Sequence, residues 1–134
     1  MRTLPTFLAS LLILAGVERS VAQTTPQCSG AQKAWVVADL LFGRTHVSEA
    51  SFARFLAAEV TPRFPDGFTV IDARGQWRNP DSRKISRERS KVLMIAMPPG
   101  ADNDERLQKI IEAYKVRFKQ QSVGLIVRPA CVSF

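Results

Sequence analysis

The side chains best suited to chemistry gather in residues 61–78, "TPRFPDGFTVIDARGQWR", and in the polar segment that follows. Both segments mix Asp and Glu with Arg and Lys. A carboxylate in an enclosed site can act as acid or base, while a neighbouring cation holds an anionic group. The candidate ligand- or partner-binding residues are Arg44, Arg63, Asp66, Asp72, Arg74, Gln76, Trp77, Glu88 and Lys91.

The common catalytic and metal-binding arrangements find few suitable residues. His46 is the only histidine, and Glu49 three residues later does not make a credible metal site with it alone. One His and two cysteines that we expect to be bridged cannot supply a Ser/His/Asp or Cys/His set. The sequence has no glycine-rich phosphate motif. We therefore expect a solvated His46, no metal and no cofactor.

Residues 1–22 have the pattern of a cleaved secretory signal. Arg2 precedes the apolar run "LPTFLASLLILAGV", and Ser20 and Ala22 are the small residues before the expected cut. The run is short for a membrane span of about 20 residues, although an uncleaved anchor is the alternative. No later run could span a bilayer, and Cys28 lacks the small apolar residues that precede a lipidated cysteine. We expect an exported protein, periplasmic or secreted, with no membrane span after cleavage.

The charge of the mature chain is compatible with several anionic partners. Removing 22 of the 134 residues leaves 112, and losing Arg2, Glu18 and Arg19 lowers the net charge from +7 to +6. Such a surface can bind anionic lipid or polysaccharide, or can simply be well solvated. Export argues against nucleic acid as a partner. The basic run Arg83, Lys84, Arg87 and Arg89 could face a polyanion, but a solvated loop is the plainer interpretation.

The two cysteines, Cys28 and Cys131, lie near the two ends of the mature chain. In an oxidising compartment an even pair is expected to be bridged. A bridge that closes about 100 residues could contribute roughly 4–5 kcal/mol in the chain-entropy model.

The order of the expected elements is β-α-β-β-α-β. Residues 23–32 form a tether and residues 33–134 a single domain, with strands over 33–43, 68–73, 90–97 and 123–132. Ser48 begins the first helix, which ends before Pro62, and Asp102 with Glu105 forms a capping box for the second. Residues 75–88 read as a polar connection. This order predicts an α+β, ferredoxin-like sandwich, in which an antiparallel four-stranded sheet of order 4-1-3-2 carries both helices on one face. Strands one and four are then neighbours, which places Cys28 beside Cys131.

One face of that sheet is left open, and we expect the charged positions of the strands to lie there. Strand one would contribute Asp39 and strand four Arg128, close enough to pair across neighbouring strands. Strand two would contribute Asp72, near Ser90 or Lys91. Apolar side chains on the same face favour a ligand or a partner surface, although solvated ion pairs alone are the plainer explanation. The open-face positions of the three strands are Trp35, Val37, Asp39, Leu41, Val70, Asp72, Arg74, Gln76, Gly124, Ile126 and Arg128.

Four segments carry a resemblance to a known family. They are "LLFGR" at 40–44, "VS" at 47–48, residues 61–78, and "RERSKVLMI" at 87–95. With these segments the chain resembles a bacterial exported family catalogued as domain of unknown function number 3574. The resemblance covers nearly the whole mature chain, implies export and brings no established activity. The chain departs from lipid-anchored members because it lacks a lipidation box.

Two hypotheses of function remain. The first is a non-catalytic module that binds a small anionic ligand or a protein partner through the open sheet face and the 75–91 hairpin. A homodimer through the open face is one form of it. The alternative is a cofactor-free enzyme, whose pocket a sheet-to-sheet dimer could form. In it Asp72 or Glu88 acts as acid or base, and Arg74, Arg63 or Lys91 holds an anionic group.

Overall fold

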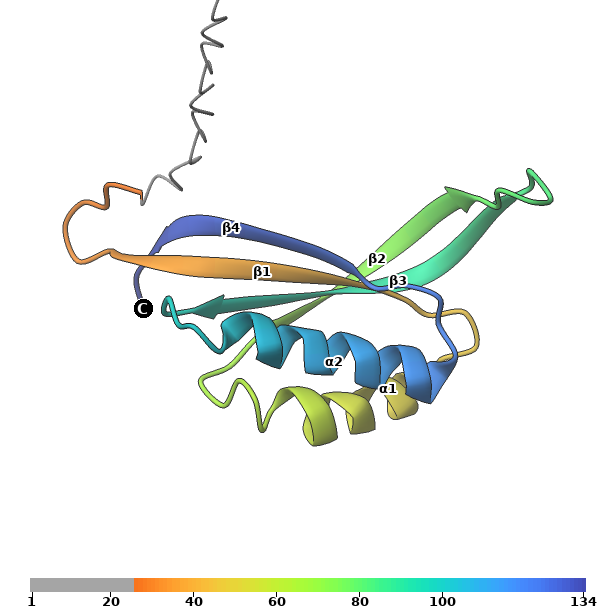
Figure 1. Cartoon of the computed structure of the whole chain (residues 1–134), viewed down its shortest axis with the longest axis horizontal. Helices are drawn as coiled ribbons and strands as arrows, with labels where there is room; N and C mark the ends of the chain where they lie inside the picture. Colours follow the sequence, from red (N-terminus) through yellow and green to blue (C-terminus); the bar gives the residue numbers. More distant parts are fainter. Residues whose placement is uncertain (1–25) are drawn as a thin grey trace, which may run out of the picture.

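The computed structural model describes residues 26–134, which form a four-stranded antiparallel sheet covered by helices on one face (Figure 1). The strand order is β2-β3-β1-β4, which is the predicted order 4-1-3-2 read from the other edge. The ferredoxin-like prediction is therefore confirmed. The elements are β1 (Lys33–Gly43), α1 (Glu49–Phe55), the π-helix η1 (Leu56–Val60), β2 (Thr69–Arg78), β3 (Ile85–Met97), α2 (Asn103–Phe118) and β4 (Gly124–Val132).

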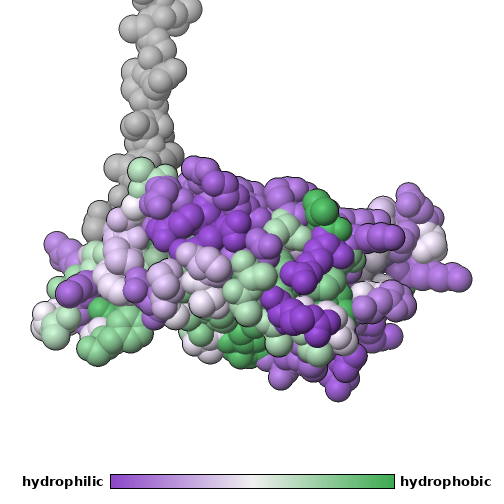
Figure 2. All heavy atoms as spheres, turned by 90° about the horizontal axis from the view of Figure 1, so that it is seen from below, coloured by the Kyte–Doolittle hydropathy of each residue, from purple (hydrophilic) through white to green (hydrophobic). Residues whose placement is uncertain are grey.

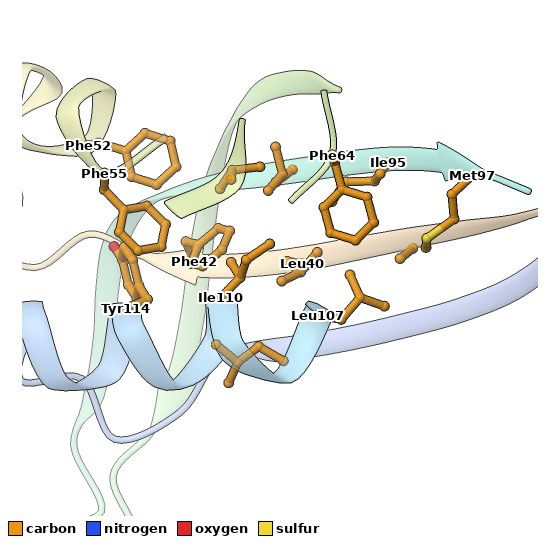
Figure 3. Packing of buried hydrophobic residues seen from close by; sticks show 14 of the residues in the cluster. Leu40, Phe42, Phe52, Phe55, Phe64, Ile95, Met97, Leu107, Ile110 and Tyr114 are labelled. Atoms are coloured by element: carbon orange, nitrogen blue, oxygen red, sulfur yellow. The ribbon is translucent and has the colours of Figure 1, made fainter. Parts of the chain in front are cut away.

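The core lies between the helices and the facing side of β1 and β3 (Figure 3). Alternate residues of these strands point to the helices, because the side-chain period of a strand is two. Rings of Phe42, Phe52, Phe55 and Tyr114 pack against one another at centroid distances between 4.5 and 6.2 Å. Burying each such side chain stabilises the fold by about 1.5–3 kcal/mol.

The first helix begins where the sequence predicts and ends in a π-helical turn. The Ser48 Oγ accepts a hydrogen bond from the Ser51 backbone N–H at 3.1 Å, as expected of an N-cap. At the other end the Thr61 N–H donates to the Leu56 carbonyl at 2.9 Å, five residues back. Pro62 follows at once and has no N–H with which to continue the ladder.

The start of α2 differs from the predicted capping box. Asp102 has a helical backbone, with φ −91° and ψ −4°, and its side chain makes no capping hydrogen bond. The carboxylate is instead 3.1 Å from the Arg106 guanidinium, and Glu105 pairs with Lys109. An N-cap needs an extended backbone to turn its side chain toward the first free N–H groups. Because Asp102 has helical backbone angles, its carboxylate pairs with Arg106 one turn later instead of capping the helix.

The largest difference concerns residues 75–88, which the sequence predicted as a polar connection. Instead, β2 and β3 continue together beyond the helices as a two-stranded ribbon, and only residues 79–84 form the turn (Figure 1). The Asn79 Oδ1 closes this turn by accepting from the N–H groups of Asp81 and Ser82, both at 2.9 Å. Neither face of a projecting ribbon is covered by the core, so its residues need not alternate in polarity. We call residues 72–91 the β2–β3 ribbon; at its base Ser90 and Lys91 still pair with β1, and beyond them the ribbon is two-stranded.

A disulfide joins the start of β1 to the end of β4. Cys28 and Cys131 are bridged across a sequence separation of 103, with their Cα atoms 5.4 Å apart. This confirms the pairing that the sequence predicted. The expected signal peptide and residues 23–25 of the expected tether lie outside the described residues. Within residues 26–134 no helix has the length and apolar character needed to cross a membrane.

Candidate functional site

Asp72, Arg74 and Gln76 lie on the helix side of the sheet, so their predicted placement on the open face is wrong. Val70 packs against the core, and residues two apart on a strand share a face. The register agrees, because Asp72 pairs with Lys91, whose side chain reaches the helical segment at Glu49. The prediction assumed that helices cover the whole of one face. The ribbon extends past them, which leaves room for charged side chains on that face.

Lys91 joins two of the candidates on this side of the sheet. Its Nζ lies 2.6 Å from the Asp72 Oδ1 and 3.1 Å from the Glu49 Oε2, while Lys91 itself is only 7% exposed. The hydrogen bond to Asp72 raises the pKa of Lys91. Hydrogen bonds from Arg44 and then Lys91 lower the pKa of Glu49. The Lys91 charge is therefore already balanced by two carboxylates, and this leaves it poorly placed to hold an anionic ligand.

Arg44 is the second buried cation, at 3% exposure, and it holds the turn between β1 and α1. Its Nη1 forms an ion pair with Glu49, and its Nη2 donates to the Val47 carbonyl at 2.9 Å. The guanidinium carbon also sits 5.6 Å from the centre of the Phe52 ring. Through these contacts Arg44 stabilises the turn between β1 and α1.

Arg63 and Asp66 lie apart from the other candidates, in the connection between η1 and β2. The Arg63 Nη1 donates to the carbonyl and the carboxylate of Glu59, at 2.6 and 2.9 Å. Asp66 is exposed in the turn that Gly67 completes with a φ of 120°. Nothing in this arrangement brings either residue to Asp72, Glu88 or Lys91.

Glu88 occupies the face of the ribbon opposite Asp72 and lies in a groove of about 850 Å³. Its Oε2 accepts a hydrogen bond from the Thr45 Oγ1 at 2.5 Å. A Cβ added to Gly43 would come within 2.8 Å of the Glu88 Oε1, and one added to Gly75 would lie 3.7 Å from its Cγ. Two glycines on the neighbouring strands therefore leave the space that this side chain fills. Within residues 26–134 the Glu88 carboxylate forms no ion pair.

Tyr114 fixes the strand backbone beside this carboxylate. Its hydroxyl donates to the Gly43 carbonyl at 2.7 Å, and the side chain is fully buried. Burial raises the pKa of Tyr114 to about 12, with Arg44 opposing the shift and the charge of Glu88 adding to it. The hydroxyl therefore remains a donor at physiological pH and ties α2 to the end of β1.

The ribbon and the turn between α2 and β4 form the walls of this groove. Trp77, 42% exposed, lies on the same face of the ribbon as Glu88. The residues that line the groove offer an aromatic surface, a carboxylate acceptor and several hydroxyl and amide groups. We call this the Glu88 groove; its lining residues are Leu41, Phe42, Gly43, Thr45, His46, Val47, Gly75, Gln76, Trp77, Ser86, Glu88, Ser90, Arg117, Phe118, Lys119, Gln120, Gln121, Ser122 and Gly124.

The open face of the sheet carries the predicted ion pair between Asp39 and Arg128. Leu41, Ile71 and Ile126 are exposed on the same face of the sheet, at 40, 47 and 49%. The apolar and charged mixture predicted for β1 and β4 is therefore present. The β2 residues on this face are Ile71, Ala73, Gly75 and Trp77, in place of the expected Val70, Asp72, Arg74 and Gln76.

Several residues in and beside the groove were not singled out from the sequence. Thr45 and Tyr114 are an ordinary hydroxyl residue and a core aromatic until the fold brings them to Glu88 and Gly43. Gly43 was interpreted only as the end of a strand, although its backbone is approached closely by a carboxylate. No local pattern distinguishes such a glycine from a terminator, because the close approach comes from a residue 45 positions later.

Comparison with solved structures places the fold among known proteins. A phage SAM lyase in complex with S-methyl-5'-thioadenosine is 15% identical, with a TM-score of 0.57 over 83% of this chain and 96% of that chain. CutA from Synechococcus elongatus PCC7942, complexed with a Bis-Tris molecule, is 14% identical, with a TM-score of 0.51 over 76% and 87%. At such identities the likeness shows the shared fold alone.

The sequence itself matches no curated protein significantly. One family model does match, over residues 38–134, and it is described as a protein of unknown function, DUF3574. The match includes β1 from Ala38 onward and every later element of the sheet and helix layer. The chain therefore belongs to the DUF3574 family.

Proposed function

We propose that this protein is a ligand-binding module whose site is the Glu88 groove. The observation that carries the proposal is the setting of Glu88. Its carboxylate is held by Thr45 and accommodated by Gly43 and Gly75, and within the described residues it has no cationic partner. A carboxylate that is positioned but not neutralised can accept hydrogen bonds from a ligand.

The chemistry of the groove limits the class of ligand. Glu88 accepts, so the ligand must donate through an amine, amide or hydroxyl group. Trp77 offers an aromatic face on which a flat ring can stack. Arg117 and Lys119 line the end of the groove at the α2–β4 turn, where they suit a negative group. A polar ring compound with donor groups therefore fits best. Nucleosides are sensible first probes, since a phage lyase of this fold was solved with S-methyl-5'-thioadenosine.

The enzyme hypothesis has less support from the geometry. It requires Asp72 or Glu88 to work with Arg74, Arg63 or Lys91 in one site. Asp72 and Lys91 neutralise each other on the helix side, and Glu88 lies on the opposite face. Arg63 is held by Glu59 in another part of the molecule. Arg74 shares a small hollow with Glu88, but within residues 26–134 the two side chains form no ion pair and belong to opposite faces of the ribbon.

A thermal-shift screen followed by calorimetry tests the binding proposal. Aromatic amines and nucleosides are titrated into the wild type, because a ligand of the native state raises the unfolding temperature. The expected result is a saturable hit whose affinity falls at least tenfold in Glu88→Gln and in Trp77→Ala. Glu112→Gln, an equal change on the exposed side of α2, should bind like the wild type. A hit that binds Glu88→Gln unchanged, or a screen without any hit, would contradict the proposal.

Export and domain organisation belong to the same proposal. We propose that residues 1–22 are removed on export, and that residues 33–134 fold as one domain closed by the Cys28–Cys131 bridge. The bridge supports an oxidising compartment. Mass spectrometry of the protein recovered from a bacterial host tests both points. A mature chain beginning at Gln23 with no free thiol is expected, and an intact Met1 would contradict cleavage.

A further inference from the structure

The ribbon has a second face, opposite Glu88 and Trp77, that is strongly basic. Arg74 and Arg78 of β2 lie on it, and β3 contributes Arg87 and Arg89. The register places Arg74 directly across from Arg89, and Gln76 across from Arg87. Because side chains alternate along each strand, these residues share the face that carries Asp72 and Lys91 nearer the core. We call it the basic face; its members are Arg74, Gln76, Arg78, Ile85, Arg87 and Arg89.

No carboxylate balances these four arginines in the described part of the chain. Asp72 is the next acidic residue along the face and is paired with Lys91. Glu88 is hydrogen-bonded to Thr45 on the other side. Arg78 donates to a backbone carbonyl of the turn, that of Arg83, at 3.1 Å. The ribbon as a whole has seven Lys and Arg against three Asp and Glu.

This arrangement is unfavourable for the isolated protein. Like charges directly opposite one another in an antiparallel pair destabilise it. Arg74 and Arg89 form such a pair. The helices do not extend over the ribbon, so packing against them does not determine which side chains the ribbon carries (Figure 1). From the helix side, the end of the molecule that the ribbon forms has a largely hydrophilic surface (Figure 2). An anion between the arginines would relieve their repulsion.

The basic face also has room for such an anion. A hollow of about 430 Å³ is lined by Arg74, Gln76, Arg87 and Arg89, together with Gly75 and Glu88. Guanidinium groups offer paired N–H donors that match the oxygens of a phosphate, and several of them can surround one group. The Gln76 amide adds a further donor. We infer that the hollow between Arg74, Arg87 and Arg89 is a binding site for a phosphate group.

The site differs from the Glu88 groove in chemistry, and its arginines lie on the other face of the ribbon, although the two hollows adjoin. Gly75, Gln76 and Glu88 line both hollows, but the acceptor and the aromatic ring belong to one face and the arginines to the other. A phosphate reaches this face either on a soluble phosphorylated compound or on a phospholipid headgroup. The chemistry of recognition is the same for both sources.

Calorimetric titration with inorganic pyrophosphate tests the site directly. The full mature protein is titrated at low and at physiological ionic strength, and saturable binding near one to one is expected. In Arg74→Gln/Arg89→Gln the affinity should fall at least tenfold. Lys33→Gln/Arg54→Gln removes the same two charges from other exposed positions and should stay within twofold of the wild type. An equal loss in both variants, or no saturable binding by the wild type, would overturn the inference.

Sedimentation with vesicles separates the two sources of phosphate. Binding to phosphatidylglycerol vesicles that pyrophosphate reverses, with none to phosphatidylcholine, would support the site and identify a headgroup. Pyrophosphate binding without vesicle binding would support it and identify a soluble compound. The inferred phosphate site does not use Trp77. Trp77→Ala should therefore leave pyrophosphate affinity unchanged, whether or not the Glu88 groove binds a ligand. A loss of pyrophosphate affinity in Trp77→Ala would show that the two hollows are one site and overturn the separate assignment.

Discussion

The helix-covered part of the sheet and the β2–β3 ribbon share the strands β2 and β3, yet their side chains differ in burial. Near the helices, Leu93, Ile95 and Met97 of β3 are buried against α1 and α2. Along the ribbon, Arg87 and Arg89 of the same strand face solvent, and Ile85 is 55% exposed. Backbone pairing continues unchanged from one part to the other.

This difference suggests that the covered part of the sheet provides stability, whereas the ribbon provides side chains for binding. In the covered part each apolar side chain removes surface from water, so the identity of the residue decides the free energy of folding. In the ribbon the cross-strand hydrogen bonds hold the backbone, and the side chains are free to serve a ligand. Both hollows that we propose as sites are lined by the ribbon. Substitutions in the covered part should therefore change the free energy of unfolding far more than substitutions in the ribbon.

Removing an aromatic ring should have very different consequences in the two parts. Phe42→Ala leaves a cavity among the three rings that pack against it and should lower the free energy of unfolding by about 3–5 kcal/mol. Trp77→Ala on the ribbon should lower it by less than about 1 kcal/mol, because the side chain is partly in water already. Urea unfolding followed by circular dichroism measures both. Similar losses in the two variants would abolish the distinction.

The disulfide should matter for the covered part of the sheet, at the end far from the ribbon. Cys28→Ser/Cys131→Ser frees a loop of about 100 residues in the unfolded chain and should cost about 2–5 kcal/mol. The midpoint of thermal unfolding should fall, and the wild type in excess reductant should show the same decrease. If the midpoint stays the same under both conditions, the bridge is not a stabilising link between β1 and β4.

Alkaline pH should destabilise the covered part through Tyr114, the only tyrosine. The unfolded chain loses the phenolic proton near pH 10, whereas burial raises the pKa in the folded state to about 12. The free energy of unfolding is therefore unaffected by this group below pH 10. Between pH 10 and 12 it should fall by about 1.4 kcal/mol per pH unit. Tyr114→Phe should lack this contribution in urea unfolding at pH 9 to 11, and equal slopes in the two proteins would refute it.

Neutralising the basic face should, unusually for a double substitution, stabilise the protein slightly. Arg74→Gln/Arg89→Gln removes a like-charge pair and should raise the free energy of unfolding by roughly 0.2–1 kcal/mol. The gain should shrink as salt screens the charges. Lys33→Gln/Arg54→Gln provides the comparison, with a change near zero. A loss of stability would mean that the two arginines support the ribbon instead of straining it.

Much of the fold could be predicted from local pattern. The apolar run of β1 and the helical spacing of Leu107, Ile110 and Tyr114 identify elements that a core must bury. The bounds of β1 and the N-cap at Ser48 are as expected. The length of β2 and β3 was not predictable in this way. Residues 75–78 and 85–89 bury no continuous apolar face, so nothing in their pattern distinguishes a strand from a loop.

The candidate site was predicted less completely. The pair Asp39–Arg128 and the placement of Asp72 near Ser90 or Lys91 were predicted from strand order together with the expected strand bounds, because that order fixes which strands are neighbours. The face of Asp72 does not follow from it. Charge was taken to indicate the open side, but solvent also reaches the helix side where the helices end. The remaining candidates divide between the Glu88 groove, the basic face and the distant Arg63–Glu59 pair.

The sequence by itself determined the order of strands and helices, the pairing of Cys28 with Cys131 and the family. These depend on periodicity, on cysteine placement and on motifs that are local along the chain. Only the tertiary structure decided that Glu88 lies against Gly43 and Thr45, and that Arg74 lies opposite Arg89. Such contacts depend on strand register and on how far the helix layer reaches. Both are settled by packing between segments distant in sequence, where no local pattern can record them.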